Sequence, residues 1–190
     1  SMISKRWNLL FALPLLLAAL LLASTQAVYA EERTCRGALG GITVDNLRVP
    51  QGATCTLNGT RVKGTIKVET NATLRAANVA VNGNVQGESA ARVEFVGGSV
   101  GGSIQVVQGG AARVEGARIN GDILFDANRS SLSAARNQIG GSLQAFQNSG
   151  GLSISNNRIN GNLQCKANTP APTGGGNQVQ GSKEDQCARL

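Results

Sequence analysis

The sequence predicts an all-β, single-domain fold: a right-handed parallel β-helix of about seven coils, with 19–20 residues per coil and disulfide-stapled ends. Three observations support this prediction. Glycine recurs at a nearly constant interval, Val, Ile or Leu flanks each of these glycines, and apolar residues elsewhere in each repeat stand two apart. No stretch after residue 30 shows a sustained helical period, so helices are not expected there.

A marker glycine defines the repeat. The spacing between markers is 19 residues in the first half of the chain and 20 in the second. The markers are Gly64, Gly83, Gly102, Gly121, Gly141, Gly161 and Gly181. Val or Ile stands two residues before every marker, and an aliphatic residue stands two after each except the last, where Lys183 occurs. A period near twenty indicates a solenoid, because each repeat buries its apolar face only against its neighbours.

The remaining apolar residues predict strands. Pairs such as Val93 with Phe95 and Leu152 with Ile154 are two residues apart, which is the period of a strand. Gly, Asn and Ser interrupt these segments, so each coil should hold two or three short strands joined by tight turns. Coils stacked about 4.8 Å apart then form parallel sheets around an apolar centre. Parallel crossovers favour the right-handed form.

Two columns of asparagine support the stacking. Asn137, Asn157 and Asn177 stand four residues before their markers. Asn128, Asn148 and Asn168 stand seven after theirs, and Asn71 shares this second column. Stacked amides at turns can hydrogen-bond from coil to coil, so we expect two asparagine ladders.

The first thirty residues have the pattern of a cleaved secretory signal peptide. Lys5 and Arg6 precede an apolar run over residues 9–23, and Val28-Tyr29-Ala30 resembles a cleavage site. A retained membrane anchor is the alternative, but the run is short for a spanning helix and contains a proline. The predicted location is therefore periplasmic or secreted, with no membrane span after cleavage.

The rest of the chain divides into two parts. Residues 31–60 are expected to form an N-terminal cap and first coil, and residues 61–190 the β-helix repeats with a C-terminal cap. This mature chain has 16 Lys and Arg against 11 Asp and Glu, a net charge of +5 that favours anionic partners only mildly. It has no His, Trp, Tyr or Met, and its aromatic residues are Phe95, Phe125 and Phe146. These absences argue against nucleic-acid binding by base stacking and against His-dependent catalysis.

The four cysteines predict two disulfides. An exported chain with four cysteines allows three connectivities. Cys35 and Cys55 are 20 residues apart, and Cys165 and Cys187 are 22 apart. Residues one coil apart stack within disulfide reach, so we expect Cys35 to pair with Cys55 and Cys165 with Cys187, one staple at each end. Zinc binding is the rival interpretation, but the chain has no His and no close Cys pair.

The chain resembles right-handed parallel β-helix proteins in its "NGN", "GGS" and "NGD" markers, their flanking Val and Ile, and the asparagine columns. The resemblance covers about residues 56–186 and implies architecture. Bactofilins, which are bacterial polymer-forming β-helices, show similar glycine-marked repeats, although they are typically cytoplasmic and lack the signal peptide and cysteines seen here. The tail "GNLQCKANTPAPTGGGNQVQGSKEDQC" is similar to that of small exported bacterial proteins of unknown function.

Some β-helix proteins are polysaccharide lyases or hydrolases, and the resemblance implies a search for their paired carboxylates. Glu69, Glu88 and Asp126 stand five residues after their markers, with Val107 between the last two. They are the candidate catalytic residues. Glu69 and Glu88 should lie one coil apart and are also the best candidate for Ca²⁺, although six or more oxygen ligands are needed. A solvated acidic patch is the simpler interpretation.

Arginines give the candidate binding residues. Arg61, Arg118 and Arg158 each stand three residues before a marker and should face solvent on one side, although other residues interrupt the column. A second column, Arg75, Glu94 and Arg113, predicts an alternating charge ladder across neighbouring coils. For these last three residues a structural ladder is favoured over catalysis.

Two functions follow as hypotheses. The first is an exported non-catalytic structural or binding module of the bacterial envelope or extracellular space, which presents a repetitive polar surface to an anionic glycan or an envelope protein. Self-association is a further option, and no cofactor is expected. The second is a lyase or hydrolase acting on acidic glycans. The charged segment 182–186 at the C-terminal edge argues against end-to-end polymerisation there.

Overall fold

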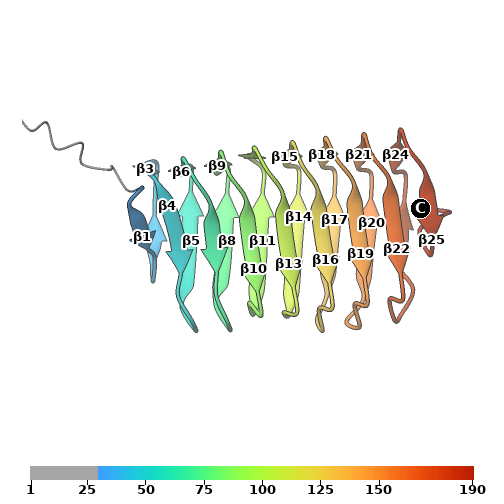
Figure 1. Ribbon diagram of the computed structural model, residues 1–190, viewed down its shortest axis with the longest axis horizontal. Coiled ribbons are helices and arrows are strands. Elements are labelled where there is room, and N and C mark those ends of the chain that lie inside the picture. The colour runs from blue at the N-terminus through green and yellow to red at the C-terminus, as the bar shows by residue number, and fades with distance from the viewer. Residues whose placement is uncertain (1–29) are drawn as a thin grey trace, which may run out of the picture.

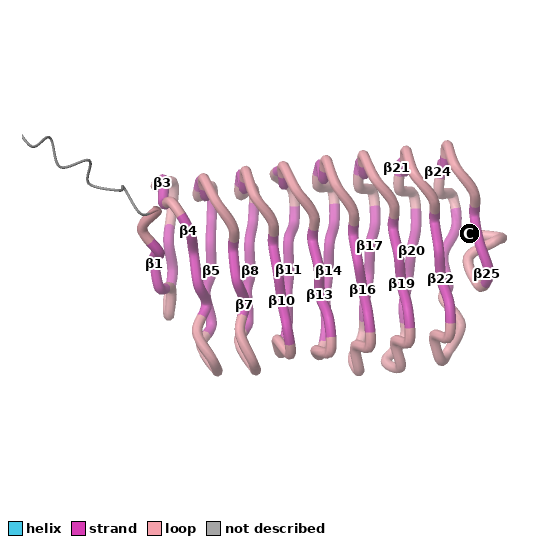
Figure 2. Tube along the Cα trace, viewed as in Figure 1, coloured by secondary structure: helices cyan, strands magenta, loops and turns pink. Residues whose placement is uncertain are grey.

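The computed structural model describes residues 30–190, and the predicted signal peptide falls, except for Ala30, outside them. The described chain is a parallel β-solenoid whose coils stack along the long axis (Figure 1). Strands and connecting turns are its only regular structure, without any helix among the described residues (Figure 2). Accordingly, these residues include no helix long and apolar enough to cross a membrane. The all-β prediction is confirmed.

Each coil contributes one strand to each of three parallel sheets, A, B and C. Sheet A contains β1 (Glu32–Thr34), β4 (Asn46–Val49), β7 (Ile66–Val68), β10 (Val85–Glu88), β13 (Ile104–Val107), β16 (Ile123–Asp126), β19 (Leu143–Phe146), β22 (Leu163–Lys166) and β25 (Lys183–Asp185). Sheet B contains β2 (Ala38–Leu39), β5 (Thr54–Asn58), β8 (Thr73–Ala77), β11 (Arg92–Val96), β14 (Ala111–Glu115), β17 (Leu132–Ala135), β20 (Leu152–Ser155) and β23 (Thr173–Gly175). Sheet C contains β3 (Thr43–Val44), β6 (Arg61–Val62), β9 (Ala80–Val81), β12 (Ser99–Val100), β15 (Arg118–Ile119), β18 (Gln138–Ile139), β21 (Arg158–Ile159) and β24 (Gln178–Val179).

The solenoid has about eight turns, one more than the seven marker glycines suggest. The additional turn is the first, β1 to β3, which precedes Gly64 and has no marker of its own. Its register with the next coil is short: Glu32 pairs with Asn46, and Thr43 with Arg61. Because these offsets are below 19 residues, a search for the regular period misses this coil.

The core is built by the predicted columns. Strand residues alternate between buried and more exposed, as in Ile66–Val68, because successive side chains point to opposite faces of a sheet. Phe95 and Phe125 are fully buried, together with the Val, Ile and Leu that flank the marker glycines, except for the partly buried Val179 in the last coil. Each such large side chain contributes roughly 1.5–3 kcal/mol when it leaves water.

The marker glycines lie at the corner between sheets C and A. None of them has a positive φ, so backbone conformation is not the reason for glycine there. The reason is close approach: a Cβ on Gly83 would lie 2.6 Å from the carbonyl oxygen of Gly64 in the previous coil. Stacking at this corner therefore excludes any side chain.

A ladder of side chains, absent from the sequence predictions, follows these glycines. The residue after each marker accepts a hydrogen bond, through its side-chain oxygen, from the backbone N–H of its equivalent in the next coil. The distances are 2.7–3.2 Å. Its members are Asn46, Thr65, Asn84, Ser103, Asp122, Ser142, Asn162 and Ser182. This corner ladder extends over nearly the whole stack.

The two asparagine ladders are confirmed, and all six asparagines are buried. Asn128 donates to Asn148, Asn148 to Asn168, and Asn168 to Gln186. The inclusion of Asn71 is wrong. It is exposed at the tip of a turn with φ +57°, while Ala72 takes the buried place beside it. The next coil has Ala90 at the corresponding position, so no amide is available to continue a ladder.

Both predicted disulfides are present. Cys35 bonds to Cys55 with a Cα–Cα distance of 5.5 Å, and Cys165 to Cys187 with 5.3 Å. The two cysteines of each pair are not direct strand neighbours. Cys165, for example, has Asp185 as its neighbour in the last coil. Each bond closes the chain onto an end of the stack, and two disulfides indicate an oxidising, non-cytoplasmic environment.

Candidate functional site

The predicted carboxylates lie along one edge of sheet A, and the structure brings only two of them together. Glu69 and Glu88 line a hollow of about 250 Å³ with Gln51, Thr70 and Ser89. Asp126 lies two coils beyond Glu88, because Val107 occupies the intervening position of the register. Asp126 is therefore apart from the other two carboxylates, as Val107 in the sequence column indicates.

Glu69 is already engaged. Its Oε1 accepts a hydrogen bond from Arg48 at 3.3 Å, and its Oε2 accepts one from the backbone N–H of Gln51 at 3.1 Å. Arg48 also donates to Glu32 at 2.8 Å, and hydrogen bonding to Glu32, then to Glu69, raises the pKa of Arg48. Ion pairs of Arg48 thus link the first three coils along this edge.

A calcium site needs more donors than the structure supplies here. Among residues 30–190 no group of three or more Cys, Asp or Glu side chains lies close enough to hold a metal ion. Glu69 and Glu88 alone fall short of the six to eight oxygen ligands that Ca²⁺ takes.

The Arg75, Glu94 and Arg113 column is in register as predicted, since β8, β11 and β14 align these three residues. The ion pairs differ from a simple ladder. Glu94 pairs with Arg92 of its own strand at 2.9 Å and with Arg75 at 3.9 Å. Arg113 instead pairs with Glu115 on its own strand, because residues two apart point the same way.

Glu115 also pairs with Arg136 of a later coil. The hydrogen bond from Arg113, reinforced by the one from Arg136, lowers the pKa of Glu115 below its ordinary value of 4.5. On sheet B and the turn beside it, the arginines in these ion pairs therefore already have an acidic partner.

Sheet C presents a different surface. Arg61, Arg118 and Arg158 all point outward from it and share one register column. Gln138 separates Arg118 from Arg158, whereas Ala80 and Ser99 separate Arg61 from Arg118. The structure thus brings Arg118 and Arg158 together, two coils apart, and leaves Arg61 outside this group.

Exposed amides flank these two arginines. Arg118, Asn120, Gln138, Arg158 and Asn160 line a hollow of about 260 Å³ whose floor is opened by Gly140. A second hollow of about 350 Å³ continues it along the stack past Arg158 to Gln178 and Gln180. We call this surface the arginine–amide strip; its residues are Arg118, Asn120, Gln138, Arg158, Asn160, Gln178 and Gln180. The flanking amides were not among the predicted binding residues, although each stands one or three residues before its marker.

The strip has positive charge and no carboxylate. Among the described residues, the cations in ion pairs are Arg48, Lys63, Arg75, Arg92, Arg113 and Arg136, and neither Arg118 nor Arg158 is one of them. Two coils at about 4.8 Å each place the backbones of the two arginines about 9.6 Å apart. The two arginines can bind two anionic groups at that spacing, and the amides can hydrogen-bond to hydroxyl groups between them.

Comparisons of the chain with protein-family models, with curated proteins and with solved structures gave no match. The likeness to bactofilins and to small exported proteins therefore stays a prediction from the sequence, and functional inference depends on the surface chemistry described above.

Proposed function

We propose that the protein is an exported, non-catalytic binding module of the bacterial envelope or extracellular space, which holds an anionic glycan along the arginine–amide strip. The observation that carries this proposal is the pair of guanidinium groups, Arg118 and Arg158, that have no acidic partner and line adjoining hollows.

Arginine suits this role because its planar donors match a carboxylate or sulfate in a two-pronged geometry. Here the two arginines repeat with the solenoid, so a polymer whose negative groups recur at a similar interval can engage both. Binding at the second group is then intramolecular, which raises the overall affinity without new contacts. Gln138 and Asn160 add donors and acceptors for sugar hydroxyls between the charged positions.

The export part of the proposal has its own support. Two disulfides favour an oxidising compartment, and the N-terminal sequence predicts a signal peptide. A periplasmic or secreted location would bring the protein into contact with envelope and extracellular polysaccharides.

The test is binding of the disulfide-intact protein to uronate-containing and neutral polysaccharides at low and moderate salt. We expect retention of the uronate polymers that weakens as salt rises, with no new reducing or unsaturated chain ends. Arg118→Gln with Arg158→Gln should lower the affinity at least tenfold, or about 1.4 kcal/mol.

The matched control is Arg75→Gln with Arg113→Gln, which removes the same charge from sheet B. Equal weakening by both double variants would mean that net charge, and not the strip, drives binding, and the proposal would fail. Equal retention of neutral and acidic polymers by the unaltered protein would have the same consequence.

A second candidate, glycan hydrolysis, is favoured by the hollow shared by Glu69 and Glu88. The two residues come from adjacent coils, whose backbones are about 4.8 Å apart, and retaining enzymes use two neighbouring carboxylates. New reducing ends that disappear in Glu88→Gln would establish this activity and displace the non-catalytic proposal.

A further inference from the structure

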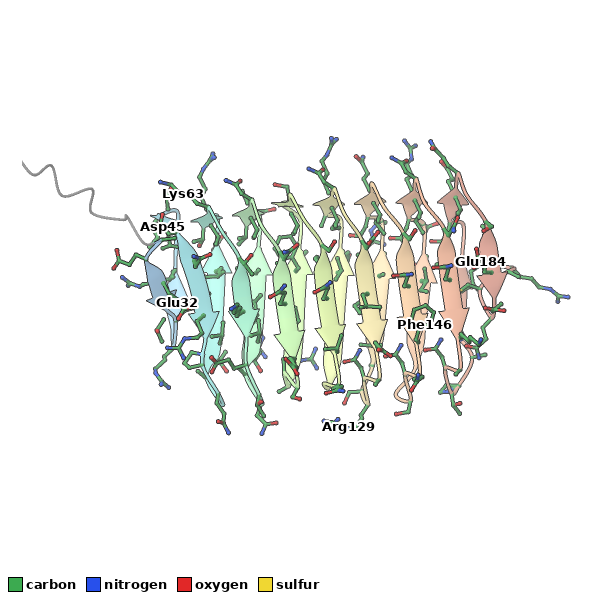
Figure 3. The ribbon with its side chains drawn as sticks, in the orientation of Figure 1. Glu32, Asp45, Lys63, Arg129, Phe146 and Glu184 are labelled. Carbon is green, nitrogen blue, oxygen red and sulfur yellow. A yellow bond between two sulfur atoms is a disulfide. The ribbon has the colours of Figure 1, made fainter. Side chains whose placement is uncertain are left out.

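Sheet A carries an apolar patch on an otherwise polar outer face. The outward positions of its described strands hold polar or charged residues except at Val107, Leu124 and Phe146. These three are half-buried and come from β13, β16 and β19, which are consecutive in the sheet. Figure 3 shows Phe146 on this face. We call Val107, Leu124 and Phe146 the apolar patch.

Phe146 is the one aromatic side chain of the described chain that reaches the surface, because Phe95 and Phe125 are fully buried. It lies between Asp126 and Lys166 in one register column. Together with Gln147 and Ala167 these residues line a hollow of about 340 Å³. An aromatic ring is thus flanked by an anion on one side and a cation on the other.

Asp126 has an unused hydrogen-bond acceptor. Its Oδ1 is buried and has no hydrogen-bond partner. Buried polar atoms are nearly always satisfied, so an orphaned carboxylate oxygen beside a hollow indicates a missing donor. Asp126 lines the hollow, and because the terminal torsion of an aspartate is soft, its carboxyl group can rotate to meet a donor there.

Lys166 is not the missing donor. It lies two strands from Asp126, about 9.6 Å between backbones, and no ion pair joins the two side chains. Its exposed side chain is therefore available to a ligand. A fitting ligand donates a hydrogen bond at one end, accepts from a cation at the other, and lays an apolar face on an aromatic ring between them.

We propose that this part of sheet A is a binding subsite for one acidic pyranose unit, such as a uronate. The C–H face of the sugar ring packs on Phe146, a ring hydroxyl donates to Asp126 Oδ1, and the sugar carboxylate accepts from Lys166 Nζ. A rigid ring suits the flat, open sheet, because a flexible zwitterion would lose more conformational freedom on binding.

This subsite is on a different sheet from the arginine–amide strip, so the two proposals can fail separately. If both hold, the protein has two faces for acidic glycans and can connect two chains or two segments of one chain. Bivalent binding of this kind strengthens attachment to a polymer far beyond either site alone.

The test uses NMR of the disulfide-intact protein with glucuronate and galacturonate, with glucose and acetate as comparison ligands. We expect shifts of the backbone amides of residues 107, 124, 126, 146 and 166, and nuclear Overhauser effects between sugar C–H protons and an aromatic ring. Those effects should vanish in Phe146→Ala, with at least a tenfold loss of uronate affinity.

Three variants make the test specific. Lys166→Gln should weaken uronate binding more than glucose binding, whereas Val96→Ala, which removes an outward apolar side chain of sheet B, should change neither. Arg118→Gln with Arg158→Gln should leave the Phe146 contact intact, so loss of the strip and loss of the subsite are distinguishable.

Acetate binding as strong as uronate binding, or uronate shifts that persist in Phe146→Ala, would overturn the proposal. A second copy of the chain is the competing occupant of the apolar patch. Sedimentation that shows a dimer abolished by Phe146→Ala would assign the patch to self-association and likewise refute the sugar subsite.

Discussion

Oδ1 of Asn157 accepts two hydrogen bonds from Asn137 of the preceding coil, one from the backbone N–H and one from Nδ2, each at 3.0 Å. Asn157 in turn donates through Nδ2 to the carbonyl oxygen of Ala134 at 2.9 Å. Nδ2 also donates to Oδ1 of Asn177 in the next coil at 2.9 Å. One fully buried side chain thus satisfies two donors and two acceptors of neighbouring coils.

We therefore expect Asn157→Ala to destabilise the protein strongly. Four groups lose a hydrogen bond. Each buried group left without a partner costs about 1–3 kcal/mol, so a loss of at least about 3 kcal/mol should appear in urea unfolding. Asn160→Ala changes the same residue type at an exposed position nearby and should stay within about 0.5 kcal/mol. Similar losses in both variants would contradict the ladder's importance.

The marker glycines give a second prediction. Gly83→Ala places a Cβ 2.6 Å from the Gly64 carbonyl oxygen, so the coils must separate locally. We expect a loss of about 2–3 kcal/mol, the size typical of overpacking. Gly40→Ala is the matched control, because nothing lies within 4 Å of its added Cβ and its φ is not positive. The measurement is the unfolding midpoint of each variant, which should be lower for Gly83→Ala than for Gly40→Ala.

Removal of the first disulfide should loosen the N-terminal end. Replacing both Cys35 and Cys55 by Ala opens a loop of 20 residues and should lower the free energy of unfolding by about 3 kcal/mol. Because that bond ties down the first coil, amide hydrogen exchange should rise first over residues 32–49. Uniformly faster exchange along the whole solenoid would show that the end coils do not open separately.

The pH dependence follows from Glu115. Its pKa is lowered in the folded protein, chiefly by the hydrogen bond from Arg113, so its ionised form stabilises the fold above the ordinary value of 4.5. That stabilisation is lost as the pH falls through the lowered pKa. Glu115→Gln should therefore reduce stability near about pH 7 and have little effect once the pH is below the lowered pKa of Glu115.

The check is urea unfolding of the unaltered protein and Glu115→Gln across this pH range. Arg113→Gln combined with Arg136→Gln should flatten the same part of the profile, because it removes both partners of the carboxylate. An unchanged profile in either variant would assign the acid sensitivity to other carboxylates.

The sequence by itself determined the all-β class, the parallel stacking, the inward columns, both disulfide pairs and both asparagine ladders. These features follow from periodicity. A strand alternates its side chains because of covalent geometry, and a repeat of about twenty residues places equivalent side chains above one another whatever their neighbours are. The residues that share a column can therefore be identified from the sequence alone between Gly64 and Gly181.

Tertiary structure decided what the columns do not encode. The first coil closes over fewer residues than the period, and Arg113 pairs along its own strand instead of across strands. Asn71 lies at the tip of a turn, where Ala72 takes the buried place. Contacts of this kind depend on turn conformation and rotamer choice, which are set by the neighbouring coils.

The two candidate surfaces illustrate the same division. The column of Arg118 and Arg158 was predicted, whereas the hollow beside them, which Gly140 also lines, is seen only in the tertiary structure. Phe146 could have been assigned outward from its place five residues after Gly141, the column that also holds Glu69. Val107, Asp126 and Phe146 share that column, so their stacking also follows from the sequence period. The unsatisfied oxygen of Asp126 and the hollow beside Phe146 are seen only in the tertiary structure, because they depend on side-chain rotamers.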